Sequence, residues 1–334
     1  MSVAVRTGSR PAPILAVAGW LFLALAVAAC VVSIAATTQS GVPFADWQTY
    51  SNAYDRFASG GSLYSPAQLA GPYEMPLTVK TGYSYPPPSI ILLAPFVQGV
   101  AGLVAWMTLN LVLLISGLVA VLRRELGGSA PWPLAIVLFG LAVIPPFRIG
   151  VVDGNVNVAL AGLLAWIWAD DRWRRGTPVA AAFAAIIKVF PFLLVGWRAR
   201  DEGLRAIVLG GAVLLALVIV TLLLMGVTSW VDYAQAMSNA VPACETRFPS
   251  IACVLTPFVG IPLAKLAGIV VGLALALAAI RVRSRLLAFV LLAAAIVAPV
   301  TDLHPHYGLF LFVVIVVVVA HAVGRRRPRE GFAA

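Results

Sequence analysis

Charged side chains are scarce in this sequence. Only 11% of its 334 residues are Asp, Glu, Lys or Arg, whereas 61% are hydrophobic. A soluble domain carries about 25% charged residues, and a soluble fold cannot bury so much apolar surface. Apolar runs recur along the chain, each near the ~20 residues that cross the hydrocarbon core of a bilayer. The composition therefore excludes an ordinary soluble protein and predicts an all-α, polytopic integral membrane protein.

Several motifs with a known mechanism are also absent. The sequence contains no Gly-x-x-x-x-Gly-Lys-Ser/Thr segment, no Ser nucleophile elbow and no paired Cys-x-x-Cys. Their absence excludes P-loop ATPases, elbow-type serine hydrolases and zinc ribbons. Cysteine occurs only three times. Cys244 and Cys253 share one segment that we place outside the cytoplasm, where thiols tend to oxidise, so a structural disulfide between them is expected.

Acidic residues are the rarer charge, 13 against 23 Lys and Arg, which gives a net charge of +10. No basic surface interleaved with aromatic residues is visible, so no nucleic-acid partner is expected. The arginines instead concentrate in short segments between apolar runs, which face the cytoplasm by the positive-inside rule. These segments are Arg123-Arg124, 172–175, 198–205, 281–285 and 325–329. The positive charge therefore reports membrane topology.

Eight spans account for the apolar runs and place every arginine-rich segment inside. They are expected at residues 14–36, 101–122, 132–149, 156–170, 204–226, 262–280, 286–301 and 307–323. Both termini are then cytoplasmic, and residues 1–334 form one transmembrane domain. A cleaved signal peptide is the alternative for the first run, but that run continues six residues beyond Cys30, which favours an uncleaved anchor.

The apolar segment 177–197 has arginine-rich segments on both sides, so a ninth full crossing would place the later arginines outside. A re-entrant hairpin broken near Lys188-Val189-Phe190-Pro191 keeps them inside, because proline interrupts helical hydrogen bonding and broken helices are tolerated around protein cavities. A lysine at membrane depth costs about 2.5–3.5 kcal/mol, so it usually has a partner or a function. Lys188 is therefore a candidate phosphate ligand; a shallow hairpin that leaves it among cytoplasmic headgroups is the alternative.

Polar residues collect in the predicted outer segments, above all residues 37–88, with a second long outer segment at 227–262. Asp46 follows the first span by about ten residues and precedes Trp47. A carboxylate near the membrane surface can act as a general base on a sugar hydroxyl. The alternative is that Asp46 caps a short helix ending at Gly60-Gly61.

A second outer corner contains Asp153-Gly154-Asn155-Val156-Asn157, which opens the span expected at 156–170. A helix N-terminus attracts anions through its free N–H groups and its dipole. Arg148 precedes this segment by five residues. Arg148, Asn155 and Asn157 are therefore candidate ligands of a substrate phosphate; a capped helix start with an interfacial arginine is the alternative.

The last outer corner contains Asp302, His304 and His306 at alternate positions. An extended segment of this kind could hold a divalent metal, although no fourth protein ligand stands out. The alternatives are contacts of His304 and His306 with substrate hydroxyls or phosphate, or a structural role. Substrate contact is the favoured interpretation, and no metal is expected.

Several of these segments, taken in order, resemble bacterial polyprenol-phosphate-mannose-dependent mannosyltransferases, glycosyltransferase family eighty-seven of the GT-C superfamily. The resemblance extends from about residue 40 to 310. It rests on Asp46-Trp47 with Tyr50, Arg56-Phe57, Gly60 and Leu63-Tyr64, then Tyr85-Pro86-Pro87, Gly154-Asn155-x-Asn157, Lys188-x-x-Pro191, Pro299 and His304-Pro305-His306-Tyr307.

The resemblance implies a GT-C-like bundle and an inverting transfer of a sugar, mannose above all, from a polyprenyl-phosphate donor to a glycolipid or glycan acceptor. Asp46 would be the base, and Tyr85, Arg148, Asn155, Asn157, Lys188, His304 and His306 would contact substrate. No cofactor is implied, because a lipid monophosphate donor needs a metal less than a nucleotide diphosphate does. The expected place is the bacterial cytoplasmic membrane, among membrane lipids, with an extracytoplasmic active site.

A transporter or lipid flippase, or a scaffold for envelope assembly, is the alternative function. Transporters usually show paired repeats and polar sites at the bilayer midplane. In this chain the polar residues collect at one face and no repeat stands out, which favours the enzyme.

Overall fold

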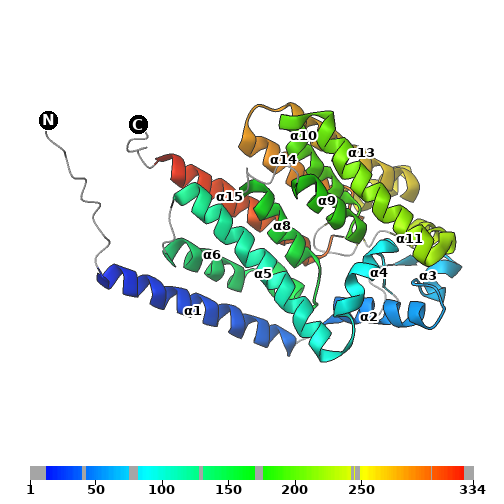
Figure 1. The fold of residues 1–334 in the computed structure, drawn as a ribbon, viewed down its shortest axis with the longest axis horizontal. Helices are drawn as coiled ribbons and strands as arrows, with labels where there is room; N and C mark the ends of the chain where they lie inside the picture. Colours follow the sequence, from blue (N-terminus) through cyan, green and yellow to red (C-terminus); the bar gives the residue numbers. More distant parts are fainter. Residues whose placement is uncertain are drawn as a thin grey trace.

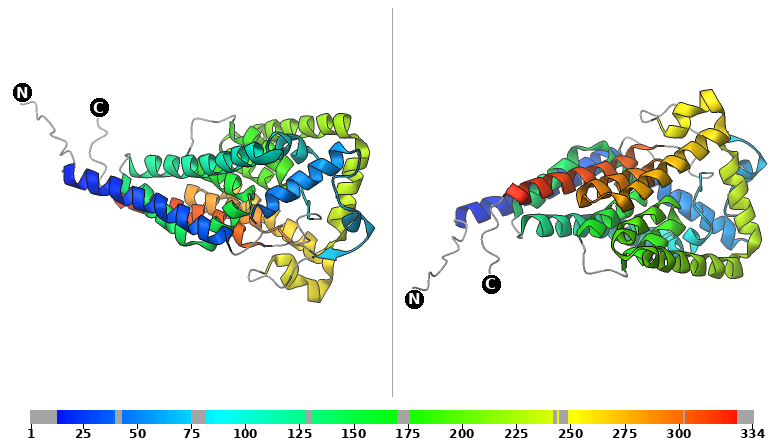
Figure 2. Two further views of the ribbon diagram at one scale, coloured as in Figure 1. Left: turned by 90° about the horizontal axis from the view of Figure 1, so that it is seen from below. Right: turned by 90° about the horizontal axis from the view of Figure 1, so that it is seen from above.

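The computed structural model describes residues 13–39, 43–74, 82–127, 131–169, 176–241, 244, 249–301 and 303–326. Helices make up nearly all of this part of the chain, and its one strand pairing joins β1 (Tyr73–Glu74) to β2 (Ala240–Val241) in parallel. Figures 1 and 2 show the helices gathered into an elongated bundle. The all-α class predicted from the composition is confirmed.

Five helices within the described residues are long and apolar enough to cross a membrane. They are α1 (Pro13–Thr38), α5 (Gly99–Leu126), α11 (Leu204–Asn239), α13 (Ile261–Arg281) and α15 (Gly308–Arg326). Large apolar side chains such as Trp20, Val104 and Leu223 are exposed on them, as is expected where lipid replaces water. α11 is kinked at Gly226, and its last part turns across the end of the bundle (Figure 2).

The predicted span at 132–149 is two helices, α6 (Pro131–Val143) and α7 (Pro145–Val152), which meet at an angle of 75°. Pro145 and Pro146 begin α7, where a missing N–H is tolerated but a continuous helix is not. The predicted spans at 156–170 and 286–301 correspond to α8 (Asn157–Ala169) and α14 (Arg285–Val297). Each has 13 residues, about 20 Å of helix, which is shorter than the ~30 Å hydrocarbon core. Length alone therefore supports five or six spans in the described chain rather than eight.

Small residues bring the central helices close together. A Cβ on Gly117 of α5 would collide with the carbonyl oxygen of Gly162 on α8, and a Cβ on Gly162 would collide with the Leu113 backbone. Gly19 of α1 leaves room for the side chains of Pro131 and Trp132 on α6. Close backbone approach at small residues is the usual basis of helix association in membranes, and here it places α8 in the middle of the bundle.

The segment expected to form a hairpin consists of α9 (Gly176–Ile187), η2 (Phe190–Val195) and α10 (Gly196–Glu202). It begins after α8, and the ring of Trp197 lies 5.8 Å from that of Trp168 near the end of α8. Arg200 on α10 donates to the carbonyl oxygen of Val282, just after α13. The chain therefore returns to the end of the bundle from which it started, with Lys188 at the turn.

The described parts of the segments predicted to lie outside the membrane are largely helical as well. They contain α2 (Ala45–Ala58), α3 (Pro66–Ala70), α4 (Pro88–Leu93), η1 (Ala94–Phe96) and α12 (Ile251–Val259), and η3 (Pro305–Tyr307) precedes α15. A capping box of Ser65 and Gln68 fixes the start of α3. Cys244 and Cys253 are joined by a disulfide, with 5.3 Å between their Cα atoms.

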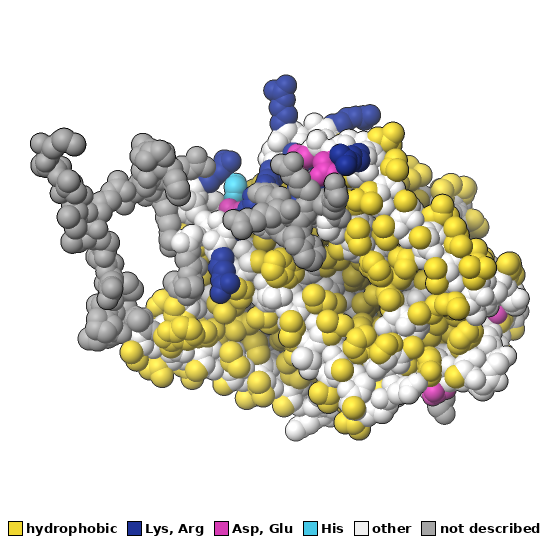
Figure 3. Space-filling view, viewed as in Figure 1, with side chains coloured by type: hydrophobic (Ala, Val, Ile, Leu, Met, Phe, Trp, Pro, Cys, Tyr) yellow, Lys and Arg dark blue, Asp and Glu magenta, His cyan; other side chains and the backbone are white. Residues whose placement is uncertain are grey.

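The bundle has one arginine-rich end. Arg124 and Arg285 both donate to the carbonyl oxygen of Trp168, and Glu125 contacts His321 at 2.8 Å. The first residues of α1 and the last of α15 lie toward this end (Figure 1). Lys and Arg side chains gather on the same part of the surface in Figure 3, while the rest of that face is largely hydrophobic. The helices of residues 45–93 occupy the opposite end.

Candidate active site

The position of Asp46 depends on how the first turn of α2 is capped. Phe44 precedes the helix with φ at 62° and offers no side-chain cap. Instead the N–H of Phe44 donates to the carbonyl oxygen of Val152 at 2.7 Å. The N–H groups of Asp46 and Trp47 both donate to the carbonyl oxygen of Asp153, at 2.9 and 3.1 Å. Because the first N–H groups of a helix have no partner within it, these bonds fix the start of α2 against the end of α7.

The turn between α7 and α8 is held from two further sides. Gly154 has φ at 69°, and a Cβ there would lie 3.0 Å from the Cβ of Trp47. Its carbonyl oxygen accepts the indole N–H of Trp106 at 2.7 Å. The indole of Trp47 itself donates to the carbonyl oxygen of Phe96. The residues on either side of Gly154 are therefore held rigidly relative to Asp46.

The amide of Asn155 joins the two halves of the site. Its Oδ1 accepts the backbone N–H of Asn157 at 2.7 Å, so its NH₂ group must point the other way. That group lies 2.5 Å from Oδ2 of Asp46 and 3.3 Å from Nε2 of His306. An amide nitrogen only donates, so Nε2 of His306 carries a lone pair and its proton is on Nδ1. Asn155 thus holds a carboxylate and a neutral imidazole side by side.

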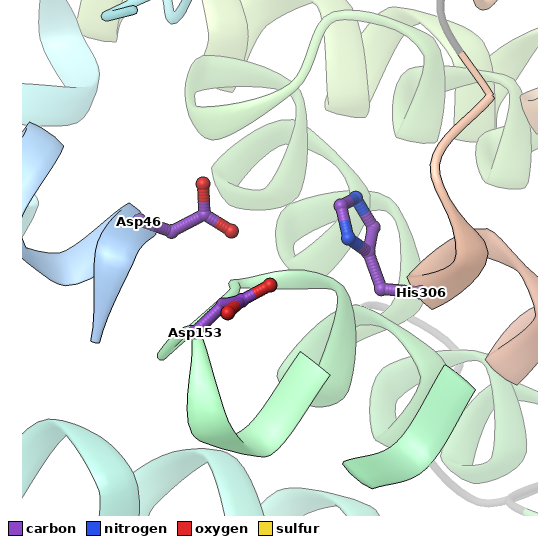
Figure 4. A group of neighbouring side chains, drawn as sticks. All are labelled: Asp46, Asp153 and His306. Atoms are coloured by element: carbon purple, nitrogen blue, oxygen red, sulfur yellow. The ribbon is translucent and has the colours of Figure 1, made fainter. Parts of the chain in front are cut away.

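Asp153 lies next to this pair, and sequence reasoning did not single it out. One ligand atom from each of Asp46, Asp153 and His306 lies within 4.8 Å of the others, and Figure 4 shows the three side chains pointing into one space from α2, the end of α7 and η3. Burial and the neighbouring Asp46 carboxylate raise the pKa of Asp153 to about 7. Burial also raises the pKa of Asp46, against the lowering effects of the Asn155 hydrogen bond and the charges of Lys188 and His304.

These three groups differ from the metal ligands considered from the sequence. Asp302 lies outside the described residues, and His304 is not a member of the close set. Two carboxylates and an imidazole could share one divalent cation. The same groups are also those expected of a general base and its neighbours.

Lys188 reaches the site from the turn of the hairpin. Its Nζ donates to the hydroxyl of Tyr307 at 2.9 Å and lies 4.5 Å from the centre of that ring. The ring of Tyr85 is 5.7 Å from the same Nζ. The ammonium group therefore has a hydroxyl and two aromatic faces around it, and it lies close enough to influence the titration of Asp46.

A cavity of about 620 Å³ collects most of the residues predicted from the sequence. Those that line it are Asp46, Tyr85, Asn155, Asn157, Lys188, His304 and His306. Arg148 is not among them; it lies on α7 and its Nε is buried without a hydrogen-bond partner. The structure therefore brings the expected carboxylate, amides, lysine and histidines together and leaves out the arginine.

The helix start at α8 is occupied by protein groups. The N–H of Asn157 donates to Asn155, that of Val158 to the backbone of Asn155, and that of Ala159 to Oδ1 of Asn110. No free backbone donors remain among these three to hold a phosphate. The capped helix start, named above as the alternative, is the arrangement observed.

The side chain of Asn157 is the exception. It is fully buried at the cavity wall, and neither its Nδ2 nor its Oδ1 has a hydrogen-bond partner in the protein. A buried polar group left unsatisfied costs about 1–3 kcal/mol. The amide of Asn157 therefore has a donor and an acceptor that no group in the described part of the protein uses.

Two more residues of the cavity wall were missed. Tyr307 holds Lys188, as described. Lys265 lies on the apolar helix α13, and its Nζ donates to the carbonyl oxygens of Met237 and Ala240 at 3.1 and 2.5 Å. A lysine inside a predicted span is itself a signal of function or pairing, so Lys265 could have been found from the sequence. Tyr307 and Asp153 could not, because their roles depend on which helices meet.

Tyrosine hydroxyls form a buried layer beside Asp46. The hydroxyls of Tyr50 and Tyr85 lie 3.0 Å apart, and Tyr64 donates to the carbonyl oxygen of Tyr85 at 2.7 Å. Burial raises the pKa of Tyr50 and of Tyr85 well above the usual value. Both phenols therefore stay neutral at physiological pH and act as hydrogen-bonding walls.

An apolar groove of about 340 Å³ adjoins the cavity. Its lining comes from α9, η2, α11 and α13 and includes Phe192, Leu214 and Leu273. Pro86, Val189, Phe190, Tyr233, Ile269 and Pro299 line both spaces. A cavity with Asp46 and Lys188 in its wall therefore adjoins a groove that offers almost only hydrocarbon.

A family model matches residues 83–303, more than half of the chain, and its description is glycosyltransferase family 87. The matched segment includes Tyr85, Asn155, Asn157 and Lys188, and it ends before His304. No curated protein and no solved structure matches the chain.

Proposed function

The chain belongs to glycosyltransferase family 87, and from this premise we propose that it moves a sugar, mannose in the expected case, from a polyprenyl phosphate to a glycolipid or glycan acceptor. The family makes it a glycosyltransferase. The finer assignment rests on one observation above all. The Asp46 carboxylate and the Lys188 ammonium line a single cavity, and that cavity continues into an apolar groove.

The two ends of a polyprenyl-phosphate sugar match these two spaces: its sugar and phosphate match the cavity, and its hydrocarbon chain matches the groove. Its sugar suits the part of the cavity wall that carries Asp46, Asn155 and Asn157. Its phosphate suits the surroundings of Lys188, since a charged group in an apolar setting needs an opposite charge nearby. Its hydrocarbon chain suits the groove, where Phe192, Leu214 and Leu273 supply apolar surface. A water-soluble nucleotide sugar would leave that groove unused.

Asp46 is the base in this proposal. One of its oxygens is held by Asn155, and the other takes the proton of the acceptor hydroxyl. The hydroxyl oxygen then forms a bond to the anomeric carbon while the bond from that carbon to the phosphate oxygen breaks. The configuration inverts, and the polyprenyl monophosphate leaves with the bonding electrons. General-base assistance of this kind contributes roughly 10²- to 10⁴-fold to a rate.

Lys188 counters the charge that develops on the leaving phosphate. Its Nζ is held by Tyr307 at 2.9 Å, so the positive charge is in place before the bond breaks, which is the arrangement that lowers a barrier most. His304 also lines the cavity and supplies a further donor toward phosphate or acceptor. Arg148 has no part in this mechanism, because it does not line the cavity.

The reaction is proposed to take place at the outer face of the bacterial cytoplasmic membrane. The arginine-rich end of the bundle, with Arg124 and Arg285, suits the cytoplasmic side by the positive-inside rule, and α2, which carries Asp46, lies at the other end. The acceptor is then a lipid-linked or envelope glycan reached from outside.

The test uses purified protein in lipid nanodiscs with polyprenyl-phosphate mannose and other polyprenyl-phosphate sugars, and with extracted membrane glycolipids as acceptors. Asp46→Asn preserves shape and most hydrogen bonding but cannot take a proton. Transfer by this variant should fall roughly 10²- to 10⁴-fold while donor binding persists. Asp55→Asn is the matched control, since Asp55 lies on the same helix, exposed and away from the cavity.

Near wild-type transfer by Asp46→Asn would exclude Asp46 as the base. Transfer only from nucleotide sugars, or movement of lipid across the membrane without transfer, would exclude the proposed donor or the proposed reaction.

A further inference from the structure

The unpartnered amide of Asn157 carries an inference about substrate specificity. Both polar atoms of its side chain lack a hydrogen-bond partner, the residue is fully buried, and it lines the cavity. Its neighbours are already engaged: the amide of Asn155 bonds to Asp46 and to the Asn157 backbone, and Lys188 bonds to Tyr307. Asn157 is therefore the amide in this wall that has both a donor and an acceptor to offer to a ligand.

The kind of ligand group follows from that pair of atoms. Nδ2 donates two hydrogen bonds and Oδ1 accepts them. An ionised phosphate offers only acceptor oxygens, so it would satisfy Nδ2 and leave Oδ1 buried without a partner. A hydroxyl both donates and accepts, and adjacent hydroxyls on a sugar ring can face both atoms of one amide. The chemistry of Asn157 thus matches a sugar and not a phosphate.

The location agrees with this match. Asn157 is two residues from Asn155, whose amide holds Asp46, and the two asparagines are joined by a 2.7 Å hydrogen bond. A sugar ring bonded to Asn157 lies beside the carboxylate that must face the attacking hydroxyl. We propose that Asn157 determines sugar specificity by bonding adjacent hydroxyls of the transferred sugar, an inference that rests on the proposed function.

Such a contact has a measurable signature. A site built around a substrate hydroxyl discriminates strongly against the analogue without it, by up to about 10⁴-fold, because the buried protein group is then left unpaired. Removing the protein group removes the penalty. Discrimination between the full sugar and its deoxy analogue therefore collapses only when the residue that contacts that hydroxyl is changed.

The experiment measures transfer by the full-length protein in nanodiscs from polyprenyl-phosphate mannose and from its monodeoxy analogues, one for each ring hydroxyl. For the wild type we expect one or two analogues to lose at least roughly tenfold in kcat/KM. For Asn157→Leu, which has similar volume and no polar atoms, those same analogues should come within about threefold of the full sugar, while the other analogues keep their ratios.

Asn110→Leu is the matched control. Asn110 is also a buried asparagine next to α8, but its amide is satisfied by the carbonyl oxygen of Trp106 and the N–H of Ala159. This variant should lower the melting temperature and leave the ratios between deoxy analogues unchanged. Asn157→Ala, which introduces no new bulk, provides the same comparison if Asn157→Leu does not fold.

Unchanged discrimination in both Asn157 variants, with transfer intact, would overturn the inference and indicate that Asn157 bonds only water. Failure of the wild type to transfer from any polyprenyl-phosphate sugar would instead reject the proposed function, and the assignment of Asn157 with it. The two failures are distinguishable, because only the first occurs in an active enzyme.

Discussion

Asp46 and Asp153 are neighbouring carboxyl groups in different surroundings. Two neighbouring carboxylates rarely ionise together, because each charge disfavours the other. Asp46 has the Asn155 hydrogen bond and the charge of Lys188 to favour its ionised form. Asp153 has mainly burial and the charge of Asp46, which raise its pKa to about 7. The surroundings of Asp46 thus include groups that favour its ionised form, whereas Asp153 keeps its proton to a higher pH than a free carboxyl group.

Asp153 should make the stability of the protein depend on pH. Its pKa is about 7 in the folded state and about 3.9 when unfolded. Between these values the folded state holds a proton that the unfolded state has released, so the free energy of unfolding falls as pH rises from about 4 to 7, by at most about 1.4 kcal/mol per pH unit. Asp153→Asn cannot titrate. Its melting temperature should therefore decline less than that of the wild type between pH 5 and 7, in matched detergent, and parallel curves would contradict the assignment.

The close approach of Asp46, Asp153 and His306 leads to a prediction about metals. We expect treatment with EDTA to leave the transfer rate unchanged, because Lys188 already supplies positive charge toward a monophosphate leaving group. The measurement is transfer by dialysed enzyme with and without added Mg²⁺ or Mn²⁺. Loss of activity on chelation, restored by one of these ions, would assign the three groups to a metal instead of to proton transfer.

At the scale of helices, the site depends on the contact of α2 with the turn between α7 and α8. The carbonyl oxygens of Val152 and Asp153 cap α2, and Gly154 fits beneath Trp47. Neither contact involves the reacting groups themselves. Both nevertheless decide where Asp46 lies relative to Asn155 and His306.

Gly154→Ala should therefore impair both stability and transfer. Its φ of 69° costs a side-chain-bearing residue roughly 1–2 kcal/mol, and the added Cβ would meet Trp47 at 3.0 Å. A displacement of about 1 Å at a catalytic group can cost 10²-fold in rate. The measurements are the melting temperature and the kcat of Gly154→Ala, each compared with the wild type.

Gly127→Ala separates the two causes. Gly127 has the same φ of 69° at the end of α5, with no atom within 4 Å of an added Cβ. Gly127→Ala should therefore lose only the stability that the backbone conformation costs, and its transfer rate should stay unchanged. Equal effects of the two substitutions would mean that the contact with Trp47 does not position Asp46.

At the scale of the whole molecule, the arginine-rich end and the candidate active site lie at opposite ends of the bundle. The arginines of α5, α10 and α14 meet at one end, where Arg124, Arg200 and Arg285 bond to backbone carbonyls. α2, which carries Asp46, lies at the other end (Figure 1). The hairpin reaches from one end toward the other, since its ends lie among the arginines and Lys188 lines the cavity.

Cysteine labelling tests the resulting orientation. In a Cys30→Ala background with the Cys244–Cys253 disulfide intact, Ser59→Cys should react with an impermeant maleimide applied to spheroplasts. Arg123→Cys and Arg205→Cys, at exposed positions before and after the hairpin, should react only after permeabilisation. Outside labelling at just one of these two arginine positions would mean that an odd number of crossings separates them, which contradicts the predicted topology.

Composition and local pattern alone determined a good part of this protein. The apolar runs predicted helices wherever the structure has long ones, because hydrophobicity over some twenty residues is a property of the local sequence. The same is true of the break at Lys188 to Pro191, since a proline acts on its own helix. Asp46, Asn155, Lys188 and the histidines could be named as candidates from residue type and order. The family resemblance is confirmed by a model that matches residues 83–303.

Only the tertiary structure decided which of those residues form a site. Asn155 contacts Asp46 across 109 residues and His306 across 151, and no local pattern encodes such distances. Arg148 and Asp153 lie five residues apart, yet only Asp153 joins the carboxylate, and the N–H groups of α8 that looked free are capped by Asn110 and Asn155. The physical reason is that the length of an apolar run depends only on consecutive residues. A cavity, a helix cap between segments or a shifted pKa exists only where separate helices meet.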